Sequence, residues 1–247
     1  MTLVLPRSDD LTSVRPSPMT MALKRAIDVV GAAVGLVLLA PVFAVVAVLI
    51  RLDSRGPVFF RQERVGHGGR PFSIFKFRSM RVGAARMSTA LTVHEDRRVT
   101  RFGALLRRRK LDELPQLINV LAGDMSLVGP RPEVPEFIKY YTPEQRAIIL
   151  STKPGMTDYA AIRFRDESAL LDSRRDPVEV YRYEIMPIKF VYYERYNSQI
   201  NILDDLRIIL ATMLLLVAGR VPHWLGMDDE LQTAPVLHKS EAKVGLL

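Results

Sequence analysis

An apolar segment from Ile27 to Ile50 limits the folds open to this chain more strongly than any other stretch. Asp28, at the start of the segment, is its only charged residue. About 20 consecutive apolar residues suffice to cross the hydrocarbon core of a bilayer as a helix. A soluble core helix is a weaker explanation, because a segment this apolar would be hydrophobic on every face. The sequence therefore predicts a membrane element.

The charges around this segment and the proline inside it favour a re-entrant element over a spanning one. Two basic residues precede the segment and two follow it: Lys24, Arg25, Arg51 and Arg55. Because basic residues concentrate on the cytoplasmic side of membranes, both ends are predicted to be cytoplasmic. Pro41 removes one backbone hydrogen bond and clashes with the preceding turn, which can fold a helix into a re-entrant hairpin. A kinked transmembrane anchor is the alternative.

A second apolar run, from Ile208 to Ala218, is only about half a membrane thickness long and cannot span. Apolar residues at and before its start fall at helical spacing: Leu203, Leu206, Ile209 and Leu210. This spacing predicts an amphipathic helix on the membrane interface or a core helix of the globular part, and both stay open.

The charge of the chain suits anionic partners. A formal net charge of +8 fits a protein on an anionic leaflet or one that handles anionic substrates, with nucleic acid as the competitor. The cationic run from Arg107 to Lys110 allows the same two partners. We expect no nucleic acid, because aromatic residues are not interleaved with basic ones as a stacking platform requires. The chain has no cysteine, and its four histidines lack ligand spacing, which argues against zinc chemistry.

The region after residue 57 has the pattern of a β-hairpin. A strand-like run, a glycine-rich turn and a stretch that alternates with a period of two follow one another: Val58 to Gln62, Gly66 to Gly69, and Phe72 to Met80. In the second strand Lys76 and Arg78 share one face, about 7 Å apart. They could flank a diphosphate, or form an exposed basic face near lipid headgroups.

Two adjacent carboxylates, Asp112 and Glu113, stand where we expect a helix to begin and to continue to Leu121. Neighbouring helical residues point about 100° apart, so the two acids can take different roles. Acidic residues and Pro115 both suit a first helical turn. Most such pairs are solvated helix starts, but here apolar residues surround the pair: Leu111, Leu114, Leu117 and Ile118. The carboxylates are therefore predicted to emerge at the edge of a core.

Arg131 lies between two prolines that restrict the backbone on both sides. Pro130 and Pro132 fix their own backbone angle, and a residue before proline is pushed to extended geometry. The planar guanidinium is thus aimed in advance, and its donors suit phosphate or uracil oxygens. A rigid turn is the structural alternative. With the carboxylate pair, this arginine indicates chemistry on a phosphate.

An ordered series of motifs, covering roughly residues 20 to 217, resembles the bacterial sugar transferases, the monotopic polyprenol-phosphate phosphoglycosyl transferases, in their compact form. The motifs are Lys24-Arg25 with Asp28, Phe60-Arg61-Gln62 with Arg64-Val65-Gly66, Phe75 to Met80, Leu111 to Gln116, Asn119 to Leu121, Gly123 to Pro132, and Lys153 to Thr157.

The resemblance implies transfer of a sugar 1-phosphate from a UDP-sugar to undecaprenyl phosphate, with release of UMP, as the first membrane step of exopolysaccharide or lipopolysaccharide biosynthesis. Asp112 would attack the β-phosphorus and form a phosphosugar-aspartate that the lipid phosphate then displaces. Mg²⁺ is the implied cofactor, held by Asp112 and Glu113, and Glu113 would position the metal or handle a proton. The implied substrate-binding residues are cations: Arg61, Arg64, Lys76, Arg78 and Arg131.

The expected architecture is a mainly helical α+β fold at the bacterial inner membrane. Its parts are a flexible tail at 1–20, a re-entrant membrane helix at 21–52, a cytoplasmic catalytic domain at 53–225 with a β-hairpin and interfacial amphipathic helices, and a tail at 226–247. The expected partners are a UDP-sugar, a polyprenol phosphate and membrane lipid. The oligomeric state is left open, with a homodimer as one arrangement.

Three positions depart from the family pattern: Ala40, Lys110 and Asp158. Of these, Asp158 puts the local turn and sugar contacts in question. The identity of the sugar is expected to depend on loops between Tyr140 and Tyr196, where five residues are candidates: Phe164, Arg165, Asp166, Tyr181 and Tyr183. A Mg²⁺-dependent phosphatase or pyrophosphatase would use the same charged residues but pass the phosphoryl group to water. A basic membrane scaffold would not need Asp112.

Overall fold

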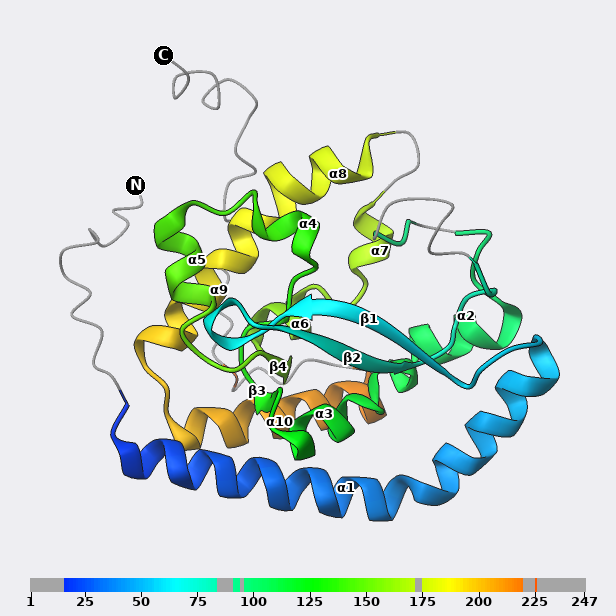
Figure 1. Cartoon of the computed structure of the whole chain (residues 1–247), viewed down its shortest axis with the longest axis horizontal. Coiled ribbons are helices and arrows are strands. Elements are labelled where there is room, and N and C mark those ends of the chain that lie inside the picture. The colour runs from blue at the N-terminus through cyan, green and yellow to red at the C-terminus, as the bar shows by residue number, and fades with distance from the viewer. Residues whose placement is uncertain (1–15, 84–90, 94–95, 172–174, 220–224, 226–247) are drawn as a thin grey trace.

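The structure is a computed structural model that describes residues 16–83, 91–93, 96–171, 175–219 and 225 of the chain. It is mainly helical with two small sheets, as the sequence predicts. A long helix, α1 (Pro18–Asp53), runs along one side of the molecule, beneath α3 (Gln116–Ala122), α10 (Ile202–Ala218) and the β-hairpin (Figure 1). Both predicted tails fall largely outside the described residues, so the proposed domain limits stay predictions.

Helix α1 is one continuous helix of 36 residues that passes through Pro41. Ser17 caps its start by accepting a hydrogen bond from the backbone N–H of Thr20. Figure 1 shows the helix bending in its second half rather than folding back on itself, so the hairpin shape expected from Pro41 is not formed. A proline removes only one hydrogen bond, and a bend relieves the clash of its ring while the other bonds persist. By length and composition α1 could cross a membrane; its re-entrant placement stays a prediction.

A buried polar cluster holds the N-terminal half of α1 against the globular part. The Lys24 ammonium donates to the carbonyl of Val128 at 2.9 Å and to the Asp205 carboxylate at 2.7 Å. The Asp28 carboxylate accepts from the backbone N–H of Leu127 at 2.8 Å. Two hydroxyl groups complete the cluster. We call it the α1 latch: Lys24, Asp28, Ser126, Tyr196 and Asp205.

The predicted β-hairpin is confirmed. Strand β1 (Phe59–Val65) pairs antiparallel with β2 (Pro71–Phe77). Gly68 and Gly69 adopt positive φ angles in the connecting turn, which glycine tolerates without steric cost. Two residues of β2, Ile74 and Phe77, are buried in two cores that each include residues of α1.

A second sheet, of two short parallel strands, was not predicted. It pairs β3 (Ser126–Val128) with β4 (Gly155–Thr157). The chains approach so closely just after β3 that a side chain on Gly155 would have its Cβ 2.1 Å from the backbone nitrogen of Gly129. Only glycine permits this approach, which brings the segment leading to Arg131 beside the segment that follows β4.

The helix expected to begin at the carboxylate pair begins later. Asp112 and Glu113 lie in a separate 3-10 turn, η4 (Leu111–Glu113), between α2 (Arg101–Arg108) and α3. Lys110 adopts a left-handed conformation with φ of 56°, which breaks the helical path before the pair, and α3 starts only after Pro115. The turn directs the two acids differently from a regular helix.

The remaining described residues form short helices around a large aromatic core that includes Phe137 and Tyr181. These elements are α4 (Pro135–Ile138), α5 (Pro143–Ile149), α6 (Tyr159–Arg163), α7 (Glu167–Leu170), α8 (Pro177–Val180), η5 (Tyr181–Ile185) and α9 (Met186–Ser198). Most of them lie on the side of the hairpin away from α1 (Figure 1).

Helix α10 supports the core-helix expectation for the second apolar run. Ile208, Ala211 and Leu215 are buried in a core shared with β3 and α9. Leu210 and Val217, on its other side, are exposed. The helix is thus a core helix with a free apolar face, and its place on a membrane interface stays a prediction.

Candidate active site

A cleft of about 960 Å³ opens between one face of the β-hairpin, the η4 turn and the short helices. From the hairpin, its lining includes alternate residues of β1, Phe60, Gln62 and Arg64, and Lys76 of β2, which is the strand partner of Phe60. The η4 turn contributes Asp112 and Glu113, and the segment after β3 contributes Arg131. The structure therefore brings together the carboxylate pair and the proline-flanked arginine, which α3 and β3 separate in the sequence.

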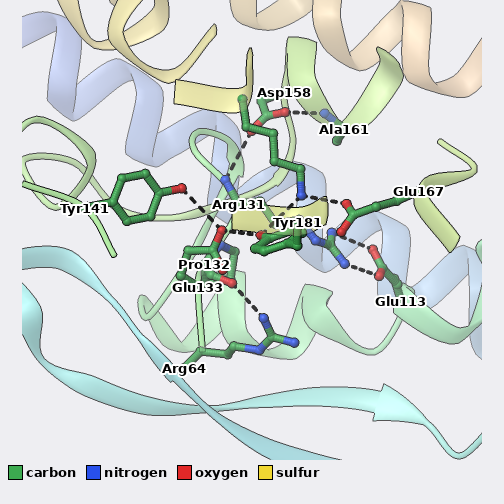
Figure 2. A network of polar contacts seen from close by, with 11 residues as sticks. Arg64, Glu113, Arg131, Pro132, Glu133, Tyr141, Asp158, Ala161, Glu167 and Tyr181 are labelled. Carbon is green, nitrogen blue, oxygen red and sulfur yellow. Dashed lines mark hydrogen bonds and ion pairs between the residues drawn. The ribbon is translucent and has the colours of Figure 1, made fainter. Parts of the chain in front are cut away.

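Glu113 is the centre of a charged cluster in this cleft. Arg131 binds it through both terminal guanidinium nitrogens, with Nη1 2.9 Å from Oε2 (Figure 2). Lys76 donates to Oε1 at 2.9 Å. Burial would raise the pKa of Glu113, but the charges of Arg131 and Lys76 outweigh it and hold the pKa well below the usual range. Burial lowers the pKa of Lys76 to about 8. Glu113 therefore stays ionised with both oxygens occupied.

Asp112, the adjacent carboxylate, is in a contrasting state. It is buried, and its Oδ1 has no hydrogen-bond partner among the residues that the structure describes. Burial, and then the neighbouring charge of Glu113, raises its pKa, while Lys76 acts in the opposite direction. A buried carboxylate oxygen without a partner is costly, and such groups cluster at functional sites. Asp112 thus offers a free oxygen to a bound electrophile or cation.

The backbone of Arg131 is fixed by Asp158. The Asp158 carboxylate accepts hydrogen bonds from the backbone N–H groups of Arg131, at 3.1 Å, and of Ala161, where it caps α6 (Figure 2). Burial raises the pKa of Asp158 to about 6. The departure noted from the sequence therefore places a buried acceptor beneath the arginine rather than an open turn.

Arg64 supports the same segment from the hairpin. Its guanidinium donates to the carbonyl of Pro132 at 3.0 Å and to the Gln62 side chain at 2.7 Å. Burial lowers the pKa of Arg64, and the charge of Arg131 lowers it further. The structure thus places Arg64 at the cleft, where its role as a substrate-binding residue stays a prediction.

Two other predicted substrate-binding cations are not in this cluster. The Arg78 guanidinium donates to the carbonyls of Ser54 and Arg55, which directly follow α1, and it also lines the cleft. Its role beside Lys76 in binding a diphosphate stays a prediction. Arg61 lies on the opposite face of the hairpin, over the ring of Phe75 at 4.5 Å. Exposed helix-end carbonyls attract cations, which explains the place of Arg78; strand alternation explains that of Arg61.

Sequence reasoning missed a second charged group at the end of the cleft away from α1. Lys189 of α9 donates to Glu167 of α7 at 2.6 Å and lies 3.4 Å from the Tyr181 hydroxyl. Glu133 accepts from the Tyr181 hydroxyl at 2.6 Å (Figure 2). Of the five sugar-site candidates, three line the cleft, Arg165, Asp166 and Tyr181, whereas Phe164 packs in the aromatic core and Tyr183 is outside the lining. Helical spacing gave no signal for Lys189 or Glu167.

A comparison with protein-family models finds that residues 19–219 match the family described as bacterial sugar transferase. A protein of Aeromonas hydrophila named UDP-N-acetylgalactosamine-undecaprenyl-phosphate N-acetylgalactosaminephosphotransferase is 42% identical over 62% of this chain and 37% of its own length. Two proteins named UDP-glucose:undecaprenyl-phosphate glucose-1-phosphate transferase are also similar. The one from Escherichia coli (strain K12) is 43% identical over 64% of this chain and 34% of its own length. The one from Caulobacter vibrioides is 46% identical over 57% and 53%. The matches thus span between a third and about half of these relatives.

Proposed function

This chain belongs to the bacterial sugar transferase family, and on that premise we propose that it transfers a sugar 1-phosphate from a UDP-sugar to undecaprenyl phosphate. The names of similar proteins support this donor class and this acceptor. One structural observation carries the proposal: Asp112, which lines the cleft, has a buried, unpartnered oxygen, while two cations neutralise the adjacent carboxylate of Glu113. That arrangement suits attack on a phosphate.

In the first step Asp112 is the nucleophile. An oxygen of its carboxylate attacks the β-phosphorus of the UDP-sugar, and the bond from that phosphorus to the bridging oxygen breaks. The electron pair leaves with UMP, and a phosphosugar-aspartate remains. Glu113 is less suited to this role, because Arg131 and Lys76 occupy both of its oxygens.

In the second step the acceptor restores the enzyme. A phosphate oxygen of undecaprenyl phosphate attacks the same phosphorus, the bond to Asp112 breaks, and the carboxylate is released unchanged. The product is a lipid-linked diphosphate sugar that starts a surface glycan. Because the nucleophile must be ionised, the cations near Asp112 serve the reaction by opposing the effect of burial on its pKa.

Glu113 serves mainly to orient the two cations. Its low pKa argues against proton exchange near neutral pH. Its two ion pairs fix Arg131 and Lys76 where they can bind phosphate oxygens that are present only in the substrate complex. When substrate binds, its phosphate oxygens can replace the Glu113 carboxylate as the partner of Arg131 and Lys76.

The site also fits the expected Mg²⁺. Within the described residues no group of three or more acidic or histidine ligands occurs, so the protein would supply few ligands and the diphosphate oxygens the rest. Asp112 is suited to hold the ion because Oδ1 is free, with Glu113 beside it. When bound, Mg²⁺ neutralises charge on the diphosphate. Loss of UMP release on chelation, and its return with Mg²⁺ alone, is the expected result.

The proposal places α1 in the cytoplasmic leaflet with both ends on the cytoplasmic side. Near its start, Lys24 binds the carbonyl of Val128, and near its end Arg78 binds the Ser54 hydroxyl at 3.0 Å. Both contacts are to the same globular region. A helix that crossed the bilayer would carry its two ends to opposite sides, which these contacts oppose.

Cysteine labelling tests this placement, because the chain has no cysteine of its own. Thr20→Cys and Leu52→Cys, made separately, are both expected to react with a membrane-impermeant maleimide added to inverted vesicles, whose outer face is the cytoplasmic one. Neither is expected to react when the reagent is added to intact spheroplasts. Reaction of the two positions from opposite sides would establish a spanning helix instead.

Nucleotide release tests the reaction. The unmodified protein in lipid, with Mg²⁺ and a panel of UDP-sugars, is expected to release UMP only when undecaprenyl phosphate is present, and Asp112→Asn is expected to abolish this release. Release of UDP would indicate ordinary glycosyl transfer, and UMP without acceptor would indicate hydrolysis. No release from any donor would favour the scaffold alternative.

A further inference from the structure

The cleft has two unlike ends. Near the end of α1 its lining combines apolar side chains, such as Pro57 and Phe60, with arginines, among them Arg78. At the other end it is ionic, with Lys189 and Glu167. Ion pairs connect the α1 end to the carboxylate pair, because Lys76, the strand partner of Phe60, binds Glu113, and Glu113 binds Arg131. Apolar side chains and arginines beside an apolar helix suit the acceptor, which has an apolar chain and an anionic phosphate. That assignment leaves the end with Lys189 and Glu167 for a polar part of the donor.

The ionic end is a built site rather than a surface ion pair. The Lys189 side chain is only 3% exposed, and its ammonium is enclosed by the Glu167 carboxylate at 2.6 Å and the ring of Tyr181 at 4.9 Å. Burying a lysine is costly unless the charge is paired. The pair therefore fixes the Glu167 carboxylate in one position.

Glu167 keeps hydrogen-bonding capacity that faces the cleft. Lys189 occupies Oε2, while Oε1 has no partner in the part of the chain that the structure describes, and the side chain is 26% exposed. Its negative charge contributes to raising the pKa of Arg131, and Figure 2 draws both residues in the same network as Glu113. Glu133, another acid at this end, accepts hydrogen bonds from two tyrosines on its Oε1.

We propose that Glu167, held in place by Lys189, binds a hydroxyl group of the sugar being transferred and so discriminates among UDP-sugars. The inference rests on the proposed function, in which the phosphorus attacked by Asp112 carries the sugar. The sugar must then lie next to Arg131, and a carboxylate oxygen is a strong acceptor for its hydroxyl protons. The uracil N3–H and the ribose hydroxyls are donors too, and comparison with UMP separates them from the sugar.

The test compares binding of a UDP-sugar with binding of UMP, which lacks the sugar, by calorimetry on the full chain in lipid nanodiscs. For Glu167→Gln we expect the dissociation constant of the preferred UDP-sugar to rise about 10-fold or more, as for a lost hydrogen bond to a charged group. The dissociation constant of UMP should stay within about twofold, because UMP does not reach Glu167. The ratio of dissociation constants between two UDP-sugars that differ at one hydroxyl should be smaller in Glu167→Gln than in the unmodified protein.

A matched control and a second variant separate sugar binding from loss of structure. Glu184→Gln removes a carboxylate that is also 26% exposed and also paired, to Arg175, but outside the cleft lining; it should change neither constant. The double variant Glu167→Gln with Lys189→Met leaves no unpaired buried charge, and should show the same loss for the UDP-sugar and the same unchanged UMP affinity.

Equal weakening of UMP and UDP-sugar in the double variant, or unchanged preference among sugars, would overturn the proposal. UMP release by the unmodified chain, measured on the same samples, tests transfer separately. A chain that binds UDP-sugars through Glu167 but releases no UMP would refute the transferase and support the sugar site.

Discussion

Two buried charged clusters in this molecule are built from the same residue types and differ in what they leave open. In the α1 latch, Lys24 pairs with Asp205 at 2.7 Å. In the cleft, Lys76 pairs with Glu113 at 2.9 Å, and Arg131 joins them. Both clusters connect segments distant in sequence, and both contain groups whose pKa is shifted by burial.

The difference lies in unused hydrogen-bonding capacity. In the α1 latch the charged side chains have partners, and the cluster is enclosed between α1, β3 and α10. In the cleft, Asp112 Oδ1 and Arg64 Nε lack partners among the described residues, and both side chains line an open space. A buried ion pair alone is weak evidence of function. An unpartnered buried group facing a cavity is stronger evidence.

The largest expected effect comes from Asp112→Asn, which tests the functional side of this comparison. Removing a covalent nucleophile should lower acceptor-dependent UMP release by about 1,000-fold or more. The free energy of unfolding should stay the same or rise, since the variant removes a buried carboxylate whose pKa is raised. Kinetics and chemical denaturation on one preparation measure both. Asp204→Asn, in a surface ion pair, is the control and should change neither.

The next largest effect should come from Lys24→Met, which tests the structural side. It leaves Asp205 buried without its cation, and breaking such a pair costs about 3–5 kcal/mol of stability. UMP release per folded molecule should change much less than in Asp112→Asn. Adding Asp205→Asn should recover part of the stability. If folded Lys24→Met lost as much UMP release as Asp112→Asn does, the distinction between the two clusters would be wrong.

A smaller effect concerns pH and Asp158, which connects the cleft to the fold. Its pKa is raised to about 6 from 3.8, so the folded state holds a proton that the unfolded state has lost between these values. This group therefore makes the free energy of unfolding fall as pH rises through that window, by at most about 3 kcal/mol. Denaturation at pH 4.5 and pH 7 should show that Asp158→Asn flattens the dependence. An unchanged slope would contradict the assignment.

The sequence predicted local features of this molecule well and long-range ones unevenly. The hairpin and the apolar helix follow from patterns within a few residues, and the placement of Arg131 near the carboxylates is confirmed by its ion pair with Glu113. The contacts of Arg78 could not be predicted, because its partners are the backbone carbonyls of Ser54 and Arg55, and backbone carbonyls carry no residue signature. Lys189 of α9 and Glu167 of α7 are 22 residues apart and meet through an ion pair that no sequence spacing predicts.

Arg61→Gln should have the smallest effect, and it sharpens the comparison by testing a cation outside both clusters. In β1, residues alternate between the two faces of the hairpin, and Arg61 faces away from the cleft, over Phe75. An exposed cation–π contact contributes only about 0.5–1 kcal/mol. UMP release should therefore stay within about twofold, whereas Arg64→Gln, on the cleft face of the same strand, should reduce it more. A larger loss for Arg61→Gln than for Arg64→Gln would show that substrate or lipid phosphate reaches the opposite face of the hairpin.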